Sequence, residues 1–166
     1  MQNDGLSLCL VNKLKRIMET RTALFPGSFD PFTLGHANIV ERALALFDEI
    51  VIAVGINEAK RTHFSLDERL EAIRRIYAAE PRVKVAGYDT LTMDFARKVG
   101  AKYIVRGLRS VRDFEYERDM ADFNRRIGGI ETILLFAKPE YEAISSSAAK
   151  ELFAFGKDIS WLLPKQ

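Results

Sequence analysis

Apolar residues along the chain follow two different spacings, and the alternation between them predicts a repeated strand–helix pattern. Short continuous apolar runs, typical of buried strands, end at glycine, proline or charged residues. Between these runs, apolar residues recur at helical spacing, and residues 65–68 carry a Ser-x-x-Glu capping box. The predicted strands are residues 22–25, 50–54, 83–85, 102–105 and 131–137. The predicted helices follow Thr33, start at Ser65, and cover residues 91–99, 114–127 and 145–155.

This alternation predicts an α/β protein. Because each strand is apolar almost throughout, both faces of the sheet should be covered, which is typical of parallel sheets. We therefore expect a doubly wound, five-stranded parallel sheet in a single domain over residues 21–166. Residues 1–20 are interpreted as an N-terminal extension or the product of a start-site artefact, with Met18 as an alternative start.

Composition and charge narrow the function classes. The chain has 166 residues, 48% hydrophobic and 29% charged, with a formal net charge of +2. Its longest apolar run falls far short of the roughly 20 residues that span a bilayer, so no membrane association is expected. Near-neutral charge excludes the basic surface of a nucleic-acid coat, so any anion site must arise from local placement of cations. The single cysteine, Cys9, is typical of a reducing compartment, which predicts a cytoplasmic location.

Cations, hydroxyl groups and glycines follow the predicted strands. Ser28 comes after the first strand, Lys60 lies in the loop after the second, residues 106–109 follow the fourth, and residues 145–147 follow the fifth. In doubly wound sheets, ligands bind outside the carboxyl ends of the strands. Phosphate oxygens accept hydrogen bonds from hydroxyl groups, guanidinium groups and helix N-termini. The pattern therefore predicts a phosphate-rich ligand.

Several common catalytic motifs are absent. Neither G-x-x-x-x-G-K-[ST] nor G-x-G-x-x-G follows a predicted strand, which disfavours a P-loop nucleoside triphosphatase and a dinucleotide oxidoreductase. There is no G-x-S-x-G motif, and the two histidines are not spaced for a zinc site. We therefore assign no metal ligand among the protein side chains.

Four features have both a structural and a functional interpretation. His36 is either a packed residue at a helix start or a donor to an anion held there. Arg106 and Arg109 are either solvated or form a bidentate anion site, and their position after a buried strand favours the second. Residues 145–147 are three serines at a predicted helix start. They either cap the helix or contact a ligand, because one serine suffices for a cap. Glu117 is either a surface carboxylate paired with a cation or a group that faces the ligand.

Together these motifs resemble a known family. Residues 25–31 (FPGSFDP), followed by Gly35-His36, resemble the T/HxGH signature of the nucleotidyltransferase superfamily, which shares its fold with class I aminoacyl-tRNA synthetases. With residues 106–109 (RGLR), 113–117 (DFEYE) and 144–147 (ISSS), the chain is similar to the phosphopantetheine adenylyltransferases of bacterial coenzyme A synthesis. The resemblance implies a Rossmann-like fold and transfer of AMP from ATP to 4′-phosphopantetheine, which yields dephospho-coenzyme A and pyrophosphate.

The resemblance also implies roles for individual residues. The phosphopantetheine phosphate would bind Ser28, Lys60, Thr92 and Arg106, and catalysis would depend on Lys60, Arg106 and the transition-state stabiliser His36. Ser28 stands where the family often has threonine, and Thr92 occupies a variable position. ATP would contact Ser28, Phe29, His36, Gly107, Leu108, Arg109, Glu117, Tyr141, Glu142, Ala143, Ile144, Ser145, Ser146 and Ser147.

Charge arithmetic predicts how such a transfer proceeds. A phosphate monoester is largely a dianion at neutral pH, so it needs no strong general base. The difficulty is repulsion by ATP, which positioning and neutralisation by cations and Mg²⁺ would overcome.

The resemblance further implies a homohexamer and possible feedback inhibition by coenzyme A. The alternatives are transfer to nicotinate mononucleotide or glycerol phosphate, which the RGLR and ISSS motifs disfavour, and a nucleotide-sensing module without turnover.

Overall fold

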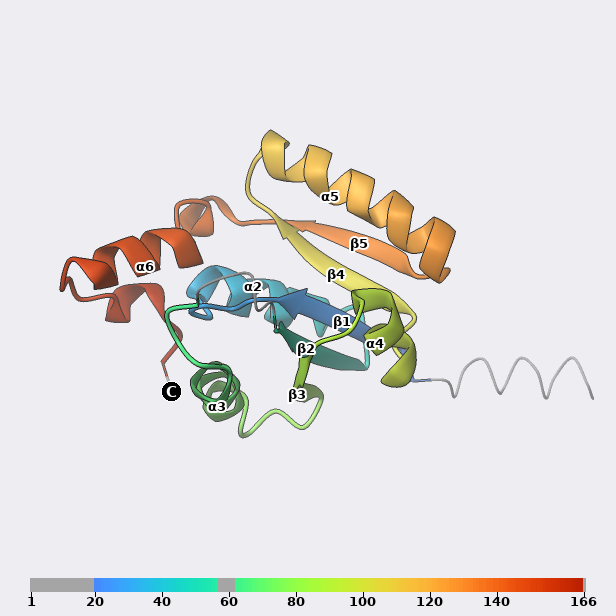
Figure 1. Ribbon diagram of the computed structural model, residues 1–166, viewed down its shortest axis with the longest axis horizontal. Helices are drawn as coiled ribbons and strands as arrows, with labels where there is room; N and C mark the ends of the chain where they lie inside the picture. Colours follow the sequence, from blue (N-terminus) through green and yellow to red (C-terminus); the bar gives the residue numbers. More distant parts are fainter. Residues whose placement is uncertain (1–19, 57–61, 166) are drawn as a thin grey trace, which may run out of the picture.

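The computed structural model describes residues 20–56 and 62–165 (Figure 1). Strands and helices alternate along the chain, as the spacing of apolar residues predicts. The strands are β1 (Thr22–Gly27), β2 (Glu49–Gly55), β3 (Val83–Tyr88), β4 (Tyr103–Leu108) and β5 (Glu131–Phe136). The α-helices are α2 (Leu34–Ala43), α3 (Leu66–Ile76), α4 (Thr92–Lys98), α5 (Val111–Phe123) and α6 (Ser146–Ala154). Short helices are η1 (Asn124–Gly128), η2 (Pro139–Tyr141) and η3 (Ser160–Leu162).

The five strands form one parallel sheet in the order β3-β2-β1-β4-β5. The chain builds outward from β1 to β3 and then returns to the other side of β1, where β4 begins the second half (Figure 1). This confirms the predicted doubly wound α/β fold in a single domain. The direction of winding changes between β1 and β4, so the crevice for a ligand lies at the carboxyl ends of these two strands.

Alternation along β2 shows how the sheet is buried on both faces. Ile50, Ile52 and Val54 are fully buried in a cluster with side chains of α2 and α3, whereas Val51 and Ala53 pack with side chains of α4. Successive strand residues point to opposite faces, so a continuous apolar run is the sequence signature of such a strand.

The structure differs from the sequence prediction at the end of the fourth strand. We expected the strand to end at Val105, but the ladder with β5 continues through Arg106↔Leu134 to Leu108↔Phe136. The charge of Arg106 and the glycine after it interrupt the apolar run without interrupting the backbone pairing. Arg106 therefore has the fixed direction of a strand side chain. It shares a sheet face with Ile104, which packs in the same cluster as side chains of α4.

Helix ends follow their local signals. Ser65 and Glu68 form the predicted capping box of α3, and the helical segment after β4 ends at Gly129, whose φ of 64° is left-handed. The helix after β4 begins at Val111 rather than Phe114, because Ser110 accepts a hydrogen bond from the N–H of Asp113 at 3.1 Å.

None of the helices in residues 20–56 and 62–165 is long and apolar enough to cross a bilayer. The interpretation of residues 1–20 as an extension falls almost wholly outside these ranges.

Candidate active site

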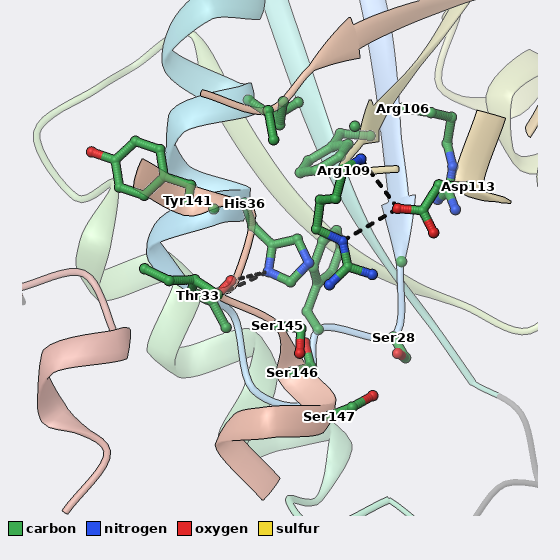
Figure 2. A pocket seen from close by; sticks show the side chains of 18 of the residues that line it. Ser28, Thr33, His36, Arg106, Arg109, Asp113, Tyr141, Ser145, Ser146 and Ser147 are labelled. Carbon is green, nitrogen blue, oxygen red and sulfur yellow. Dashed lines mark hydrogen bonds and ion pairs between the residues drawn. The ribbon is translucent and has the colours of Figure 1, made fainter. Parts of the chain in front are cut away.

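A cavity of about 270 Å³ lies at the carboxyl ends of β1 and β4 (Figure 2). Most residues predicted to contact a nucleotide line it, although they come from distant parts of the chain. These are Ser28, Phe29, His36, Gly107, Arg109, Glu117, Tyr141, Ile144, Ser145, Ser146 and Ser147. Leu108 is instead buried, and both Leu108 and Glu142 border a separate apolar hollow. Ala143 is exposed and does not line the cavity.

A second cavity, of about 630 Å³, adjoins the first. The two share Pro26, Gly27, Ser28, Arg106 and Glu117 in their walls. Of the residues predicted to bind the acceptor phosphate, Ser28 and Arg106 therefore border both cavities, and Thr92 borders the second. Lys60, predicted for the same site, lies outside the described residues. The fold thus forms two neighbouring compartments whose common wall carries a hydroxyl group and a guanidinium group.

The loop between β1 and α2 has a constrained backbone. Phe29 has a φ of 45°, a left-handed conformation that is uncommon for a residue with a large side chain. Its ring lies over Gly27, where an added Cβ would be 2.8 Å from Phe29 Cζ. The buried carboxylate of Asp30 accepts hydrogen bonds from the N–H groups of His63 and Phe64, both at 2.9 Å. These contacts fix the loop that carries Ser28 and hold it against the segment before α3.

His36 accepts a hydrogen bond at the start of α2, and its lowered pKa favours the neutral ring. Its Nδ1 accepts a hydrogen bond from the N–H of Thr33, the residue that caps α2, at 3.0 Å (Figure 2). Burial, together with the positive charges of Arg109 and Arg106, lowers the pKa of His36 from 6.5 to about 3. With Nδ1 in use as an acceptor, the single ring proton is on Nε2. His36 therefore combines a structural role in the cap of α2 with an Nε2–H at the cavity that has no partner among the described residues.

Arg106 and Glu117 form a bidentate ion pair between the two cavities. Nε and one terminal nitrogen of Arg106 donate to the two carboxylate oxygens of Glu117 at 2.9 and 2.6 Å. The other terminal nitrogen donates to the carbonyl oxygen of Pro26. Glu117 is only 7% exposed, so its pairing with a cation is a buried interaction and not the surface pair that we considered. A guanidinium group has five N–H donors, so two remain for a ligand.

Arg109 has more freedom. Its Nε lies 3.4 Å from Asp113, and its side chain is 44% exposed. The backbone N–H of Arg109 also donates to Asp113, at 3.1 Å (Figure 2). The DFEYE segment thus supplies one carboxylate to each of the two arginines predicted to bind anions.

The three serines at the start of α6 have different surroundings. Ser145 caps the helix by accepting from the N–H of Ala148 at 3.1 Å. Ser146 Oγ donates to the carbonyl oxygen of Pro31 at 2.8 Å and so holds α6 against the loop after β1. Ser147 is exposed, and no partner for its hydroxyl group is found in the described part of the chain. One serine serves as a cap, one joins two segments, and one is available to a ligand.

The second cavity contains residues that the sequence pattern did not single out. Met120, Ala121 and Asn124 line it together with Glu117, at the helical spacing i, i+3, i+4, i+7 counted from Glu117. That spacing was visible in the sequence, but it equally suits a helix face packed on a core. Across from them, the hydroxyl groups of Tyr88 and Thr92 lie 3.0 Å apart.

Carboxylates near the cavities are engaged by cations or by backbone N–H groups. Glu117 binds Arg106, Asp113 binds Arg109, and Asp30 binds two N–H groups and lies 3.5 Å from Lys150 Nζ. Within the described ranges, no three His, Cys, Asp or Glu side chains are grouped so that they could hold a metal ion.

Comparison with known proteins identifies the family. Residues 24–152 match the cytidylyltransferase-like family. The chain is 56% identical, over 145 residues, to the phosphopantetheine adenylyltransferase of Bacteroides fragilis, and the match covers 87% of this chain and 97% of that protein. The chain belongs to the phosphopantetheine adenylyltransferase family. A relative from Flavobacterium psychrophilum with the same name is 47% identical over 145 residues, 87% of this chain and 96% of the relative. As a member of this family, the protein is a nucleotidyltransferase enzyme.

Solved structures confirm the fold of this phosphopantetheine adenylyltransferase family member. A bifunctional NMN adenylyltransferase/ADP ribose pyrophosphatase from Francisella tularensis superposes with a TM-score of 0.68 at 16% identity, covering 89% of this chain and 46% of that one. A lipopolysaccharide core biosynthesis protein from Thermoplasma volcanium superposes with a TM-score of 0.54 at 21% identity, covering 72% and 98%. At such identities the likeness extends to the fold alone.

Proposed function

We propose that this enzyme transfers AMP from ATP to 4′-phosphopantetheine by direct in-line attack, without a covalent enzyme intermediate. The observation that carries the proposal is the pair of adjoining cavities that share Ser28 and Arg106. One cavity has the hydroxyl groups and the helix start suited to a nucleotide. The other is larger and has apolar and polar walls suited to a pantetheine arm. Relatives that cover nearly the same length are named phosphopantetheine adenylyltransferase.

In the proposed reaction, a phosphate oxygen of phosphopantetheine forms a bond to the α-phosphorus of ATP. The bond from that phosphorus to the bridging oxygen of the β-phosphate breaks, and pyrophosphate leaves with the electron pair. The acceptor phosphate is already largely a dianion at pH 7, so no general base is needed. The enzyme contributes positioning and charge neutralisation.

Two groups on β4 and α2 are suited to that neutralisation. The Nε2–H of His36 would donate to the α-phosphate as negative charge builds there, and neutrality of the ring keeps Nδ1 bound to Thr33. Arg106 would use its two remaining N–H groups toward the acceptor phosphate while Glu117 holds the guanidinium plane fixed. We assign the acceptor phosphate to Ser28, Lys60, Thr92 and Arg106, as the family resemblance implies.

We propose that Mg²⁺ enters as the MgATP complex and is held mainly by phosphate oxygens. This fits a site whose carboxylates Glu117, Asp113 and Asp30 are all engaged by cations or N–H groups. The ion would neutralise charge on the leaving pyrophosphate.

We further propose that coenzyme A is a feedback inhibitor and that the enzyme is a cytoplasmic homohexamer. Coenzyme A carries both a nucleotide and a pantetheine arm, so one molecule could occupy both cavities at once. Large apolar side chains on α5 and on the edge strand β5, including Val111 and Phe136, are 78% and 69% exposed and would be covered by neighbouring copies.

An acceptor panel tests the substrate assignment. We expect pyrophosphate release from ATP with 4′-phosphopantetheine, and a kcat/KM at least about 100-fold lower with nicotinate mononucleotide or glycerol 3-phosphate, because neither fills the second cavity. Comparable kcat/KM values for two acceptors would contradict the assignment. ATP binding without turnover of any of the three would indicate a nucleotide-sensing module.

A further inference from the structure

Arg69 is a buried cation that the proposed mechanism does not use. It lies in the second turn of α3 and is only 5% exposed, although arginine is almost never fully buried unless it is paired. Within the described ranges, no carboxylate forms an ion pair with it. Burying a guanidinium group without a carboxylate partner costs desolvation free energy, so Arg69 lies at this position despite that cost.

The hydrogen bonds of Arg69 go to backbone carbonyl oxygens. One terminal nitrogen donates to the carbonyl oxygen of Ser28 at 2.6 Å and approaches that of Gly55 at 3.5 Å. Its Nε donates to the carbonyl oxygen of Ser65, one turn earlier in the chain, at 3.3 Å. Ser28 follows β1 and Gly55 ends β2, so Arg69 joins the carboxyl ends of two adjacent strands to the start of α3.

Both strand ends face the second cavity. Ser28 and Gly55 line it, whereas Arg69 does not, so the guanidinium group sits behind the wall. Carbonyl oxygens satisfy hydrogen bonds but do not cancel a full positive charge. The charge therefore acts on whatever occupies the cavity, across a low-dielectric layer where screening by water is weak.

We propose that Arg69 is a positioning residue for the acceptor phosphate: it fixes Ser28 and Gly55 and supplies behind them a positive charge that no carboxylate of the described residues pairs with. This inference rests on the proposed function, in which Ser28 binds that phosphate. If Arg69 had only a structural role, its hydrogen bonds would be needed but its charge would not. Its loss would then weaken the binding of every ligand of the second cavity alike.

Calorimetry with two ligands separates these roles. 4′-Phosphopantetheine and pantetheine differ only in the phosphate group. In Arg69→Met we expect the affinity for phosphopantetheine to fall at least about tenfold, and the affinities for pantetheine and ATP to change less than about threefold. Arg69→Lys should recover part of the loss, because the charge is kept. Arg74→Met is the matched control, since Arg74 is exposed on the same helix and should leave all three affinities unchanged.

Each outcome decides the question. Equal losses for phosphopantetheine and pantetheine, or no loss for either, would overturn the proposal. If Arg69→Met does not fold, Arg69→Gln replaces it, because glutamine keeps a donor for the carbonyl of Ser28 without the charge, and the phosphate-specific loss should persist. A wild-type enzyme that binds both ligands equally would contradict the proposed function itself. A wild-type preference that survives in the neutral Arg69 variants would contradict the Arg69 proposal alone.

Discussion

At the scale of single residues, His36 shows how one side chain serves both the fold and the chemistry. Its Nδ1 completes the N-terminal cap of α2, and this bond leaves the only ring proton on Nε2. The rings of Phe29 and Phe32 lie 5.1 and 5.4 Å from the imidazole, centroid to centroid. Desolvation in these surroundings, together with the positive charges of Arg109 and Arg106, lowers the pKa of His36 and keeps its ring neutral.

Substitution of His36 should therefore affect the transition state more than ATP binding. We expect His36→Ala to lower kcat by about 10²–10³, the usual effect of losing one donor to a developing charge. His36→Gln should retain more activity, because its amide N–H can approach the position of Nε2. Steady-state kinetics and the ATP dissociation constant check this. An equal change in kcat and in ATP affinity would show that His36 acts in ground-state binding.

The pKa of His36 also predicts a pH dependence of stability. The pKa is about 3 in the folded protein against 6.5 ordinarily, so between these values the unfolded chain binds a proton that the folded chain does not. The stabilising contribution is complete above pH 6.5 and is lost as the pH falls toward 3. Urea unfolding of wild type and His36→Gln at pH 7, 6 and 5 should show a shallower pH dependence in the variant, by up to about 1.4 kcal/mol per pH unit. Parallel curves would contradict a neutral His36 in the folded protein.

At the scale of elements, adjacent serines at the start of α6 have different roles: Ser145 caps the helix, and Ser147 is available to a ligand. Ser145→Ala should lower the free energy of unfolding by about 1 kcal/mol, because the helix loses its N-cap. Ser147→Ala should leave stability within about 0.5 kcal/mol of wild type and raise the KM for ATP about tenfold. Chemical denaturation and steady-state kinetics on both variants check this. The reverse pattern would show that the cap and the ligand contact are exchanged.

The sequence could predict these elements but not all of their partners. Continuous apolar runs and local caps such as Ser65 and Gly129 determine the strands and helix ends, and local signals depend only on neighbouring residues. The pairing of Arg106 with Glu117 depends on how α5 packs against β4, which no local pattern specifies. The face of α5 at the second cavity has the same spacing as a core-facing helix, so its function could not be told from sequence. In the sequence, Arg69 has the pattern of an ordinary exposed helix arginine, and only the folded structure shows that it is buried.

At the scale of the whole molecule, the exposed apolar side chains predict self-association. Phe123 and Ile127, on α5 and η1, are 49% and 62% exposed, and Phe136 lies on the edge strand β5. We expect light scattering to give six times the 18.8 kDa chain mass. Phe136→Lys should lower that mass, because a charge on this surface opposes burial. A monomer in the wild type would contradict the hexamer.

Direct transfer of AMP between the two substrates, the central claim for this enzyme, is tested by pyrophosphate release with and without acceptor. With ATP labelled at the α-phosphate, the enzyme should release pyrophosphate only when 4′-phosphopantetheine is present, one pyrophosphate for each labelled dephospho-coenzyme A formed. No label should remain on the protein after denaturation. Release of pyrophosphate without acceptor, accompanied by labelled AMP on the protein, would contradict direct transfer across the shared wall at Ser28 and Arg106.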